Sequence, residues 1–294
     1  MSSAKPKKLP GNVDHLQRLI SDLSKERDVP PVRLQRWLNA MIVTAVLDRV
    51  RDENGEPIFL VKGGVAMELR LRLRARATKD FDAAFRARAD GVLDRLDEAL
   101  AEPWNEFSMT RSEAAPITNT KALRLAIQLH YKGRSWGTVT VELAPVEGEV
   151  MGTELDRVPA VPLEPLQVPV PEEANCVSLR YQVAQKLHAC TEVFAAGPEN
   201  DRFRDIMDVL LVAGILREKV GLHRVRTACV DIFNVRDKHA WPPTVTVYQG
   251  WRAPFAALAR ENGFTPEDVD EAAALLHQLI ADIDAANEPA EAAE

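Results

Sequence analysis

Residues Ile58 to Arg86 read IFLVKGGVAMELRLRLRARATKDFDAAFR, and the rest of the 294-residue chain is arranged around them. The apolar start of this stretch runs into Lys62 and two glycines, which predicts a strand that turns into a helix. A basic segment follows, and the residues around Asp80–Phe81–Asp82 alternate in polarity as a second strand does. We therefore expect the order strand, glycine turn, helix, basic loop, strand.

The glycine pair Gly63–Gly64 is the first candidate binding feature. A helix that begins directly after such a turn has unpaired backbone N–H groups and the positive end of its dipole available to an anion. Taken alone, two glycines after a strand more often mark only a tight turn. The preceding Lys62 either neutralises bound phosphates or extends its ammonium from the strand end into solvent.

The acidic pair Asp80 and Asp82 is the second feature. Side chains alternate along a strand, so both carboxylates are expected on one face, with Phe81, Ala83 and Phe85 on the other. A solvated edge strand is the simpler interpretation, but the apolar opposite face indicates an internal strand. Adjacent carboxylates repel each other there unless a cation lies between them. Mg²⁺ suits this pair, because water and substrate phosphates complete its coordination.

Four motifs in this order resemble the AbiEii/MenT group of nucleotidyltransferase-like toxins, which belongs to the polymerase-β-type superfamily. They are Lys62–Gly64, Thr78–Asp82, Gln185–Ala189 and Asp201–Asp208. The likeness spans roughly residues 15 to 280, and the interval from Gly64 to Asp80 is slightly longer than in much of the wider superfamily. The resemblance implies an α+β fold, with a nucleotidyltransferase-like N-terminal lobe of mixed sheet and flanking helices and a mostly helical C-terminal lobe.

Composition limits the classes of partner. The formal net charge is −7, so binding of nucleic acid requires a local basic surface rather than a basic chain. No apolar run approaches the length of a membrane span and no signal peptide is apparent, so we expect no membrane partner. Three widely spaced cysteines, Cys176, Cys190 and Cys229, lack metal-ligand spacing and indicate a reduced, cytoplasmic location.

One local basic segment is a candidate for RNA contact. It consists of four alternating arginines before the acidic strand, Arg70, Arg72, Arg74 and Arg76. The alternative is a solvated helix end, where cations also suit the helix dipole. Their place beside the expected phosphate site favours contact with a polynucleotide.

The domain organisation follows from composition and periodicity. A proline-rich connection is expected from about residue 144, because six prolines fall between residues 144 and 177. The expected regions are a disordered tail over 1–11, the nucleotidyltransferase-like lobe over 12–172, the helical lobe over 173–287 and an acidic tail over 288–294.

The expected elements are listed here by residue. Alternating strands Leu123–Leu129 and Val139–Leu143 form a hairpin with one apolar face. Helices are expected over 12–27, from Pro31 to a stop at Asn54–Gly55, over 90–100, 178–194, 201–217 and 220–234, and from a cap at Thr265 onward.

Further site residues come from the resemblance. On pattern alone Lys186 is a surface lysine and Asp208 an ordinary polar-face acid. The resemblance assigns Lys186 to the nucleotide phosphates and Asp208 to the active-site cluster, as a base or to position the nucleotide. Glu142 is either a third metal-binding carboxylate or a solvated strand residue. Thr78 matches a serine whose phosphorylation silences some relatives, because a phosphate there repels the incoming triphosphate.

The resemblance implies a Mg²⁺-dependent nucleotidyltransferase toxin. One or two Mg²⁺ ions on Asp80 and Asp82 would activate the acceptor, and Lys186 would stabilise the pyrophosphate. The nucleoside monophosphate would pass from NTP to the 3′ end of tRNA in a cleft between the lobes, blocking aminoacylation and translation. A cognate antitoxin is the implied protein partner. The alternatives are nucleotidylation of a protein hydroxyl and a non-catalytic NTP-binding module.

Overall fold

The structure is a computed structural model, which describes residues 9–86, 91–118, 120–148, 154–195, 197 and 199–287. Residues 1–8 of the tail predicted over 1–11, the tail predicted over 288–294 and the predicted helix start at Asp90 lie outside the described residues. Within the described part, no helix combines the length and the apolar character needed to span a membrane.

The chain divides into two compact units. Within the described residues, the first, here called the sheet unit, comprises Met1–Arg70, Ala77–Val146 and Arg157–Cys176. The second, the helical unit, comprises Leu71–Arg76, Glu147–Asp156 and Val177–Glu294. Two short segments that precede residue 177, 71–76 and the described residues of 147–156, therefore belong to the same unit as the helices that follow it.

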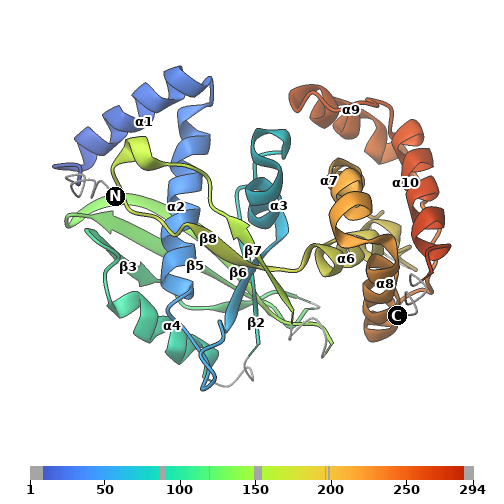
Figure 1. Cartoon of the computed structure of the whole chain (residues 1–294), viewed down its shortest axis with the longest axis horizontal. Coiled ribbons are helices and arrows are strands. Elements are labelled where there is room, and N and C mark those ends of the chain that lie inside the picture. Colours follow the sequence, from blue (N-terminus) through green and yellow to red (C-terminus); the bar gives the residue numbers. More distant parts are fainter. Residues whose placement is uncertain are drawn as a thin grey trace, which may run out of the picture. The chain divides into compact units, whose positions relative to one another are not determined.

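The first part of the chain mixes helices and strands (Figure 1). In order, the elements are α1 Val13–Arg27, α2 Pro31–Leu47, β1 Phe59–Lys62, α3 Gly63–Leu71, the 3-10 turn Arg72–Arg74, β2 Phe81–Phe85, α4 Val92–Ala101, β3 Phe107–Arg111, β4 Ala115–Pro116, β5 Leu123–Tyr131, β6 Arg134–Pro145, β7 Leu155–Pro159, the 3-10 turn Glu164–Leu166 and β8 Glu173–Val177.

A single mixed sheet forms the centre of the sheet unit, with strand order β3-β5-β6-β2-β1-β8-β7 and β4 paired to β5. Strands β1 and β2 are antiparallel, as are β5 and β6, whereas β2 pairs parallel to β6 and β1 parallel to β8. Together with the helices this confirms the predicted α+β class and mixed sheet. The strand predicted around Phe81 therefore lies in the middle of the sheet, with β1 and β6 as its neighbours.

Helix α2 covers one face of this sheet (Figure 1). It is apolar nearly all round, and its residues from Trp37 to Leu47 are all buried, as expected for a helix enclosed by other elements. The helix ends at Leu47, earlier than the stop predicted at Asn54–Gly55, because Arg51 and Pro57 pair as a β-bridge around that turn. Buried aromatic rings of Phe107, Tyr131 and Trp136 pack together at the β3–β5–β6 end of the core.

The predicted hairpin is present, and its strands are longer than expected. Strands β5 and β6 are joined by the two residues Lys132 and Gly133, both with positive φ (50° and 75°). Glycine adopts this backbone conformation without the steric cost of a Cβ, and two-residue turns of this kind match the twist of the strands. A register shift between Leu129 and His130 then brings Arg124 opposite Glu142, where the register at the turn alone would bring Val141.

The described part of the proline-rich segment, 144–148 and 154–177, contains two strands. Strands β7 and β8 both lie within it, and β8 pairs with β1 at Val61 and Cys176. The prolines stand between or at the ends of these strands, where no ladder N–H is needed. The segment therefore completes the central sheet, which its composition did not indicate.

The helical unit contains the remaining helices (Figure 1). They are α6 Leu179–Thr191, α7 Phe203–Ile215, the π-helical turn Leu216–Val220, α8 Leu222–Arg236, the 3-10 turn Gln249–Trp251, α9 Arg252–Glu261 and α10 Val269–Asp284. The last helix starts later than predicted, because the Asp268 carboxylate rather than Thr265 caps it and accepts from the N–H groups of Asp270 and Glu271. Such a cap satisfies donors that the helix itself leaves unpaired.

Replacing Phe107 by alanine tests the aromatic end of the sheet core. The ring is fully buried against Tyr131 and Trp136, so Phe107→Ala should lower the free energy of unfolding by about 3–5 kcal/mol. Urea denaturation followed by circular dichroism measures this. The exposed neighbour Ser108 supplies the control, and a loss for Phe107→Ala no larger than for Ser108→Ala would contradict the packing described.

Candidate active site

Four charged residues lie in one row across the sheet. Lys62 on β1 is paired with Asp82 on β2, Asp82 with Glu142 on β6, and Glu142 with Arg124 on β5. Residues directly opposite in neighbouring strands share a face, so the four side chains stand side by side with the charge order plus, minus, minus, plus. We call these four residues the charge row.

The opposite face of the same strands belongs to the core. The next residues along three of the strands, Phe81, Val141 and Leu125, are buried and in register with one another. Phe81, Ala83 and Phe85 all belong to the hydrophobic core, as predicted. The apolar packing on one side therefore holds the charge row in place on the other.

Arg124 is bound to Glu142 within the row. Its Nη2 lies 2.6 Å and its Nε 3.1 Å from Glu142 Oε1. The hydrogen bonds and the charge of Glu142 raise the pKa of Arg124, and the charge of Asp80 acts in the same direction. Glu142 and Asp80, two of the three candidate metal ligands, thus both raise the pKa of Arg124. Sequence analysis gave Arg124 no role.

Asp80 lies just before β2 rather than in it. It occupies a bend, its side chain is exposed, and its backbone carbonyl accepts a hydrogen bond from the Thr78 hydroxyl at 3.3 Å. The Asp80 carboxylate is accordingly less constrained by the sheet than that of Asp82.

The carboxylates of Asp82 and Glu142 are suited to binding Mg²⁺ through a small number of protein oxygens. Among the described residues, no three or more His, Cys, Asp or Glu side chains form a ready-made metal centre. Mg²⁺ is commonly bound by only one or two carboxylates, with water and substrate phosphates completing its octahedron. Asp82 and Glu142 are adjacent oxygen donors on one face, so the residues present are suited to that mode of binding.

Gly63 and Gly64 are required because side-chain atoms of other residues lie where a Cβ would be. Gly63 has φ of +59°, and a Cβ on it would come within 1.8 Å of Asp82 Oδ2. A Cβ on Gly64 would come within 2.5 Å of the Thr78 hydroxyl oxygen. The glycine turn therefore leaves space for the side chains of the acidic strand and of the loop before it.

Gly63→Ala should displace Asp82, because the added methyl group occupies the position of its carboxylate and the backbone is strained at positive φ. We expect loss of any metal-dependent activity while the helical unit stays folded. Gly214→Ala is the matched control, since its Cβ meets nothing within 4 Å. Activity and circular dichroism of both variants measure this, and an active Gly63→Ala protein would contradict the contact.

A buried carboxylate holds the loop that leads to Asp80. Glu68 on α3 is only 4% exposed, and its Oε1 accepts the Thr78 N–H at 2.7 Å. Its Oε2 accepts from the indole Nε1 of Trp37, and from Arg33 Nε at 3.4 Å. Sequence analysis missed this residue, whose signal is a lone acid within the otherwise apolar stretch Val65–Leu69.

Glu68→Gln should loosen this loop. Glutamine offers one acceptor oxygen in place of two, so a buried donor loses its partner, at a cost of about 1–3 kcal/mol. The Thr78 amide should then exchange faster with solvent in hydrogen-exchange measurements. The exposed Glu26→Gln serves as control, and unchanged protection at Thr78 would show that Glu68 does not hold the loop.

The helical unit carries a second charged cluster. Lys186 on α6 donates to Asp205 Oδ1 at 2.6 Å and to Asp208 Oδ2 at 2.7 Å, both on α7. Arg202 binds Asp205 and Arg76 binds Asp208. Lys186, Asp205 and Asp208 are buried, at 7%, 2% and 2% exposure. The surface positions predicted from pattern alone for Lys186 and Asp208 are therefore wrong, because acids of α7 pair with the lysine.

The protonation states of this cluster follow from its geometry. Burial lowers the pKa of Lys186, but the charges of Asp205 and Asp208 outweigh it and leave the pKa raised. Burial likewise raises the pKa of Asp205, but Lys186 and Arg202 outweigh it and leave the pKa lowered. Lys186 and Asp205 are thus held ionised, and Lys186 can bind a phosphate only by releasing one of its two carboxylate partners.

Lys186→Met should lower the free energy of unfolding by about 3–5 kcal/mol, because two buried carboxylates lose their shared cation. The pH dependence has a definite sign. A lowered Asp205 pKa gives stability that is present above its unfolded value of 3.8 and is lost as pH falls through the folded pKa. The variant should therefore lose less stability than wild type between about pH 5 and about pH 3. Thermal melts across this range measure both effects, with the exposed Lys219→Met as control, and parallel pH profiles would contradict the coupling.

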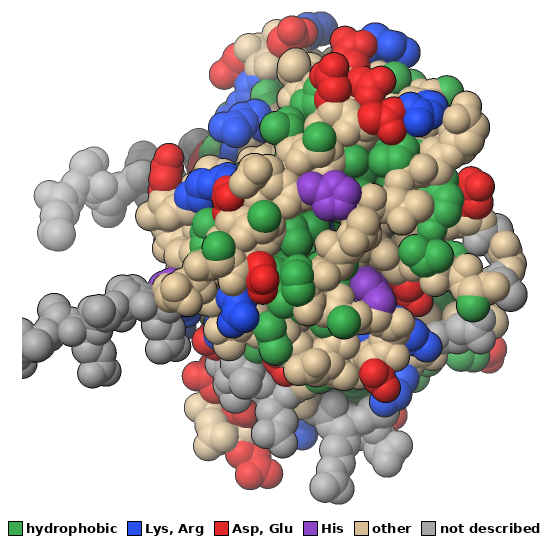
Figure 2. All heavy atoms as spheres, turned by 90° about the vertical axis from the view of Figure 1, so that its right-hand side faces the viewer, with side chains coloured by type: hydrophobic (Ala, Val, Ile, Leu, Met, Phe, Trp, Pro, Cys, Tyr) green, Lys and Arg blue, Asp and Glu red, His purple; other side chains and the backbone are tan. Residues whose placement is uncertain are grey.

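The four-arginine segment is divided between several environments. Arg70 is in the last turn of α3 and Arg72 and Arg74 form the following 3-10 turn. Arg74 is exposed and the other three are half-buried. Arg76 uses its guanidinium on Asp208. The face shown in Figure 2 has acidic and basic side chains interspersed rather than a continuous basic surface.

Comparison with known proteins agrees with this architecture. The model of the family described as "Nucleotidyl transferase AbiEii toxin, Type IV TA system" matches residues 45–290. Among solved structures, the MenT4 nucleotidyltransferase toxin of Mycobacterium tuberculosis is 15% identical with a TM-score of 0.53, over 92% of this chain and 90% of that one. A putative nucleotidyltransferase from H. pylori is 15% identical with a TM-score of 0.45, over 86% and 93%. No curated protein matches the chain in sequence.

The fold is therefore that of a nucleotidyltransferase toxin. The chain belongs to the AbiEii family of nucleotidyl transferase toxins from type IV toxin–antitoxin systems, which confirms the resemblance based on the four motifs. Membership implies an antitoxin partner and a nucleotide substrate.

Proposed function

We propose that this protein is a Mg²⁺-dependent toxin that transfers a nucleoside monophosphate from NTP to the 3′ end of tRNA, and so blocks aminoacylation and translation. The observation that carries the proposal is the charge row, with Asp82 and Glu142 side by side and Asp82 against the Gly63 backbone. These residues place oxygen ligands for a metal beside the N-terminus of α3, whose dipole favours phosphate.

The candidate site residues of the sheet unit would each contribute to the proposed reaction. Asp82, with Asp80 and Glu142, would hold Mg²⁺, which neutralises triphosphate charge and activates the acceptor hydroxyl. Gly63 and Gly64 begin α3, whose N-terminal dipole would favour the phosphates, and make room for Asp82 and Thr78. Lys62, at the β1 end of the row, would balance phosphate charge.

The transfer itself is a displacement at phosphorus. The acceptor 3′ oxygen forms a bond to the α-phosphorus, the bond from that phosphorus to the bridging oxygen breaks, and pyrophosphate leaves. The hydroxyl proton passes to a carboxylate, and the exposed Asp80 is our candidate acceptor. Asp208 already accepts from Lys186 and Arg76, so a positioning role suits it better than that of a base.

We favour RNA as the acceptor because of the basic segment Arg70–Arg76. Exposed Arg74, with Arg70 and Arg72, would contact phosphates of the tRNA, and such contacts weaken as salt rises. Transfer to a protein hydroxyl would use the same chemistry without this dependence.

The test is incubation of the purified protein with total tRNA, Mg²⁺ and each α-labelled NTP in turn. Label should enter a tRNA-sized band, and Asp82→Asn should reduce it by about a hundredfold or more, because a metal ligand is lost. Asp94→Asn, an exposed acid on α4, should have no effect. Removal of Mg²⁺ by chelation should abolish labelling.

Other outcomes select other functions. Label in a protein band but not in tRNA would establish a protein acceptor. NTP binding without transfer, and equal growth inhibition by wild type and Asp82→Asn in bacteria, would contradict catalysis and favour a non-catalytic module.

A further inference from the structure

Arg124 ends the charge row on its β5 side. It is paired with Glu142 on one neighbouring strand and with Ala115 of β4 on the other. Alanine supplies no charge, so Glu142 is the acid that holds this arginine in the sheet. The Arg124 side chain is nonetheless 57% exposed, compared with 26% for Glu142. The arginine is therefore the more open to solvent of the two.

Glu142 binds only one edge of the Arg124 guanidinium. Nε and Nη2 both donate to Glu142 Oε1, at 3.1 and 2.6 Å. Within the described part of the chain, Nη1 donates to no acceptor and Glu142 Oε2 accepts no hydrogen bond. Glu142 thus orients the guanidinium with one oxygen and keeps the other for a metal, while Arg124 keeps a donor for another anion.

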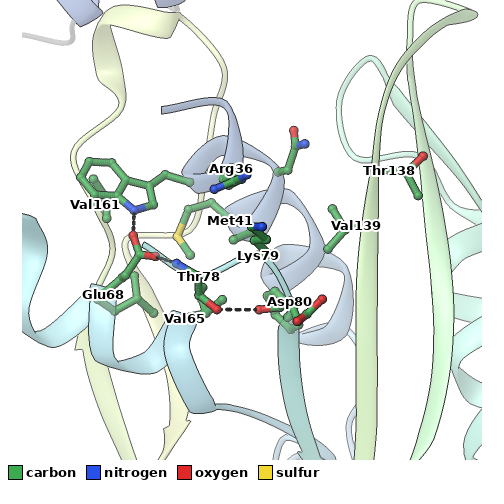
Figure 3. A pocket seen from close by; sticks show the side chains of 15 residues that line it. Arg36, Met41, Val65, Glu68, Thr78, Lys79, Asp80, Thr138, Val139 and Val161 are labelled. Atoms are coloured by element: carbon green, nitrogen blue, oxygen red, sulfur yellow. Dashed lines mark hydrogen bonds between the residues drawn. The ribbon is translucent and has the colours of Figure 1, made fainter. Parts of the chain in front are cut away.

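Asp80 adds a second negative charge that acts on Arg124. Figure 3 shows the pocket that Asp80 and Val139 of β6 both border, so the loop before β2 approaches the strand that carries Glu142. The hydrogen bonds and charge of Glu142, and then the charge of Asp80, raise the pKa of Arg124. A divalent cation held by these carboxylates therefore shares them with a guanidinium.

A cation beside a metal site opposes binding of the metal. The Coulomb repulsion between a guanidinium and a divalent ion falls only in inverse proportion to their distance, and a phosphate bound to the guanidinium cancels it. Arginine is suited to phosphate, and Nη1 is the nitrogen that Glu142 leaves for it. Phosphate on Arg124 should strengthen metal binding, and by reciprocity the metal should strengthen phosphate binding.

We propose that Arg124 binds a phosphate group of a substrate while Glu142 positions it, and that this contact couples substrate binding to metal binding. In the substrate-free protein the guanidinium weakens binding of Mg²⁺ to the charge row. A phosphate on Nη1 removes that repulsion, so metal and substrate bind together. The phosphate belongs either to the incoming triphosphate or to the RNA acceptor. The inference rests on the metal site of the proposed function.

Arg124→Gln tests this role, with Arg134→Gln as the matched control. Both arginines are exposed, lie on the same hairpin and pair with one acid, Glu142 or Asp14. Each substitution removes one positive charge, so the control reports the effect of net charge alone. Exposed ion pairs contribute little to stability, so both variants should fold, and urea denaturation checks this.

Metal binding is measured without phosphate. Mn²⁺ is titrated into each protein, and its dissociation constant is taken from the relaxation of water protons. Arg124→Gln should bind Mn²⁺ at least about threefold more tightly than wild type, because the repulsion is gone. Arg134→Gln, and Arg124→Lys, which keeps the charge, should stay within about twofold of wild type.

Phosphate binding is measured in excess Mg²⁺. Inorganic triphosphate and a short single-stranded oligoribonucleotide without terminal phosphates are titrated separately by calorimetry. Arg124→Gln should weaken binding of at least one of them about fivefold or more, because a charge-assisted contact is lost. Arg134→Gln should change neither by more than about twofold. Weaker triphosphate binding assigns the phosphate to the NTP, and weaker oligonucleotide binding assigns it to the acceptor.

The two expected effects have opposite signs, so a general loss of structure cannot produce both. Unchanged Mn²⁺ affinity in Arg124→Gln, or unchanged binding of both anions, would overturn the role of Arg124 and leave the metal site standing. Both effects without nucleotide transfer to tRNA by wild type would instead overturn the proposed function and leave the role of Arg124 standing. Absence of Mn²⁺ binding to wild type and Arg124→Gln alike would overturn the metal site and this inference together.

Discussion

The contact between the Asp82 carboxylate and the Gly63 backbone is the constraint on which the candidate site depends. It requires a residue without Cβ at the end of β1, and it requires β1 and β2 to pair so that Lys62 faces Asp82. The parallel pairing of β2 with β6 then places Glu142 beside Asp82. Backbone register, more than any side-chain contact, therefore assembles the proposed metal ligands.

Buried charges stabilise both units around this arrangement. Glu68 fixes the loop before Asp80, and Lys186 joins α6 to α7 through Asp205 and Asp208. Such groups are costly to bury and persist only when their partners are complete. Removing one partner would therefore leave an uncompensated buried charge in the loop or between the two helices.

The sequence predicted the parts whose signal is local. The β5–β6 hairpin and the core face of Phe81 both follow from the alternation of apolar and polar residues. It could not predict that β8 joins the sheet, because a proline-rich segment becomes a strand only through its partner β1. Likewise the pattern of α6 alone places Lys186 on the surface. Its burial depends on Asp205 and Asp208 of α7, which offset the cost of removing the ammonium from water.

The central claim is that the charge row holds a divalent metal, and paramagnetic relaxation by Mn²⁺ tests it most directly. Mn²⁺ is a common substitute for Mg²⁺ at oxygen ligands, and it broadens the NMR signals of nearby amides. The account predicts broadening at the amides of Gly63, Asp82 and Glu142 in wild type, reversed by excess Mg²⁺ and lost in Asp82→Asn. Absence of broadening at these three amides in wild type, or its persistence in Asp82→Asn, would contradict the account.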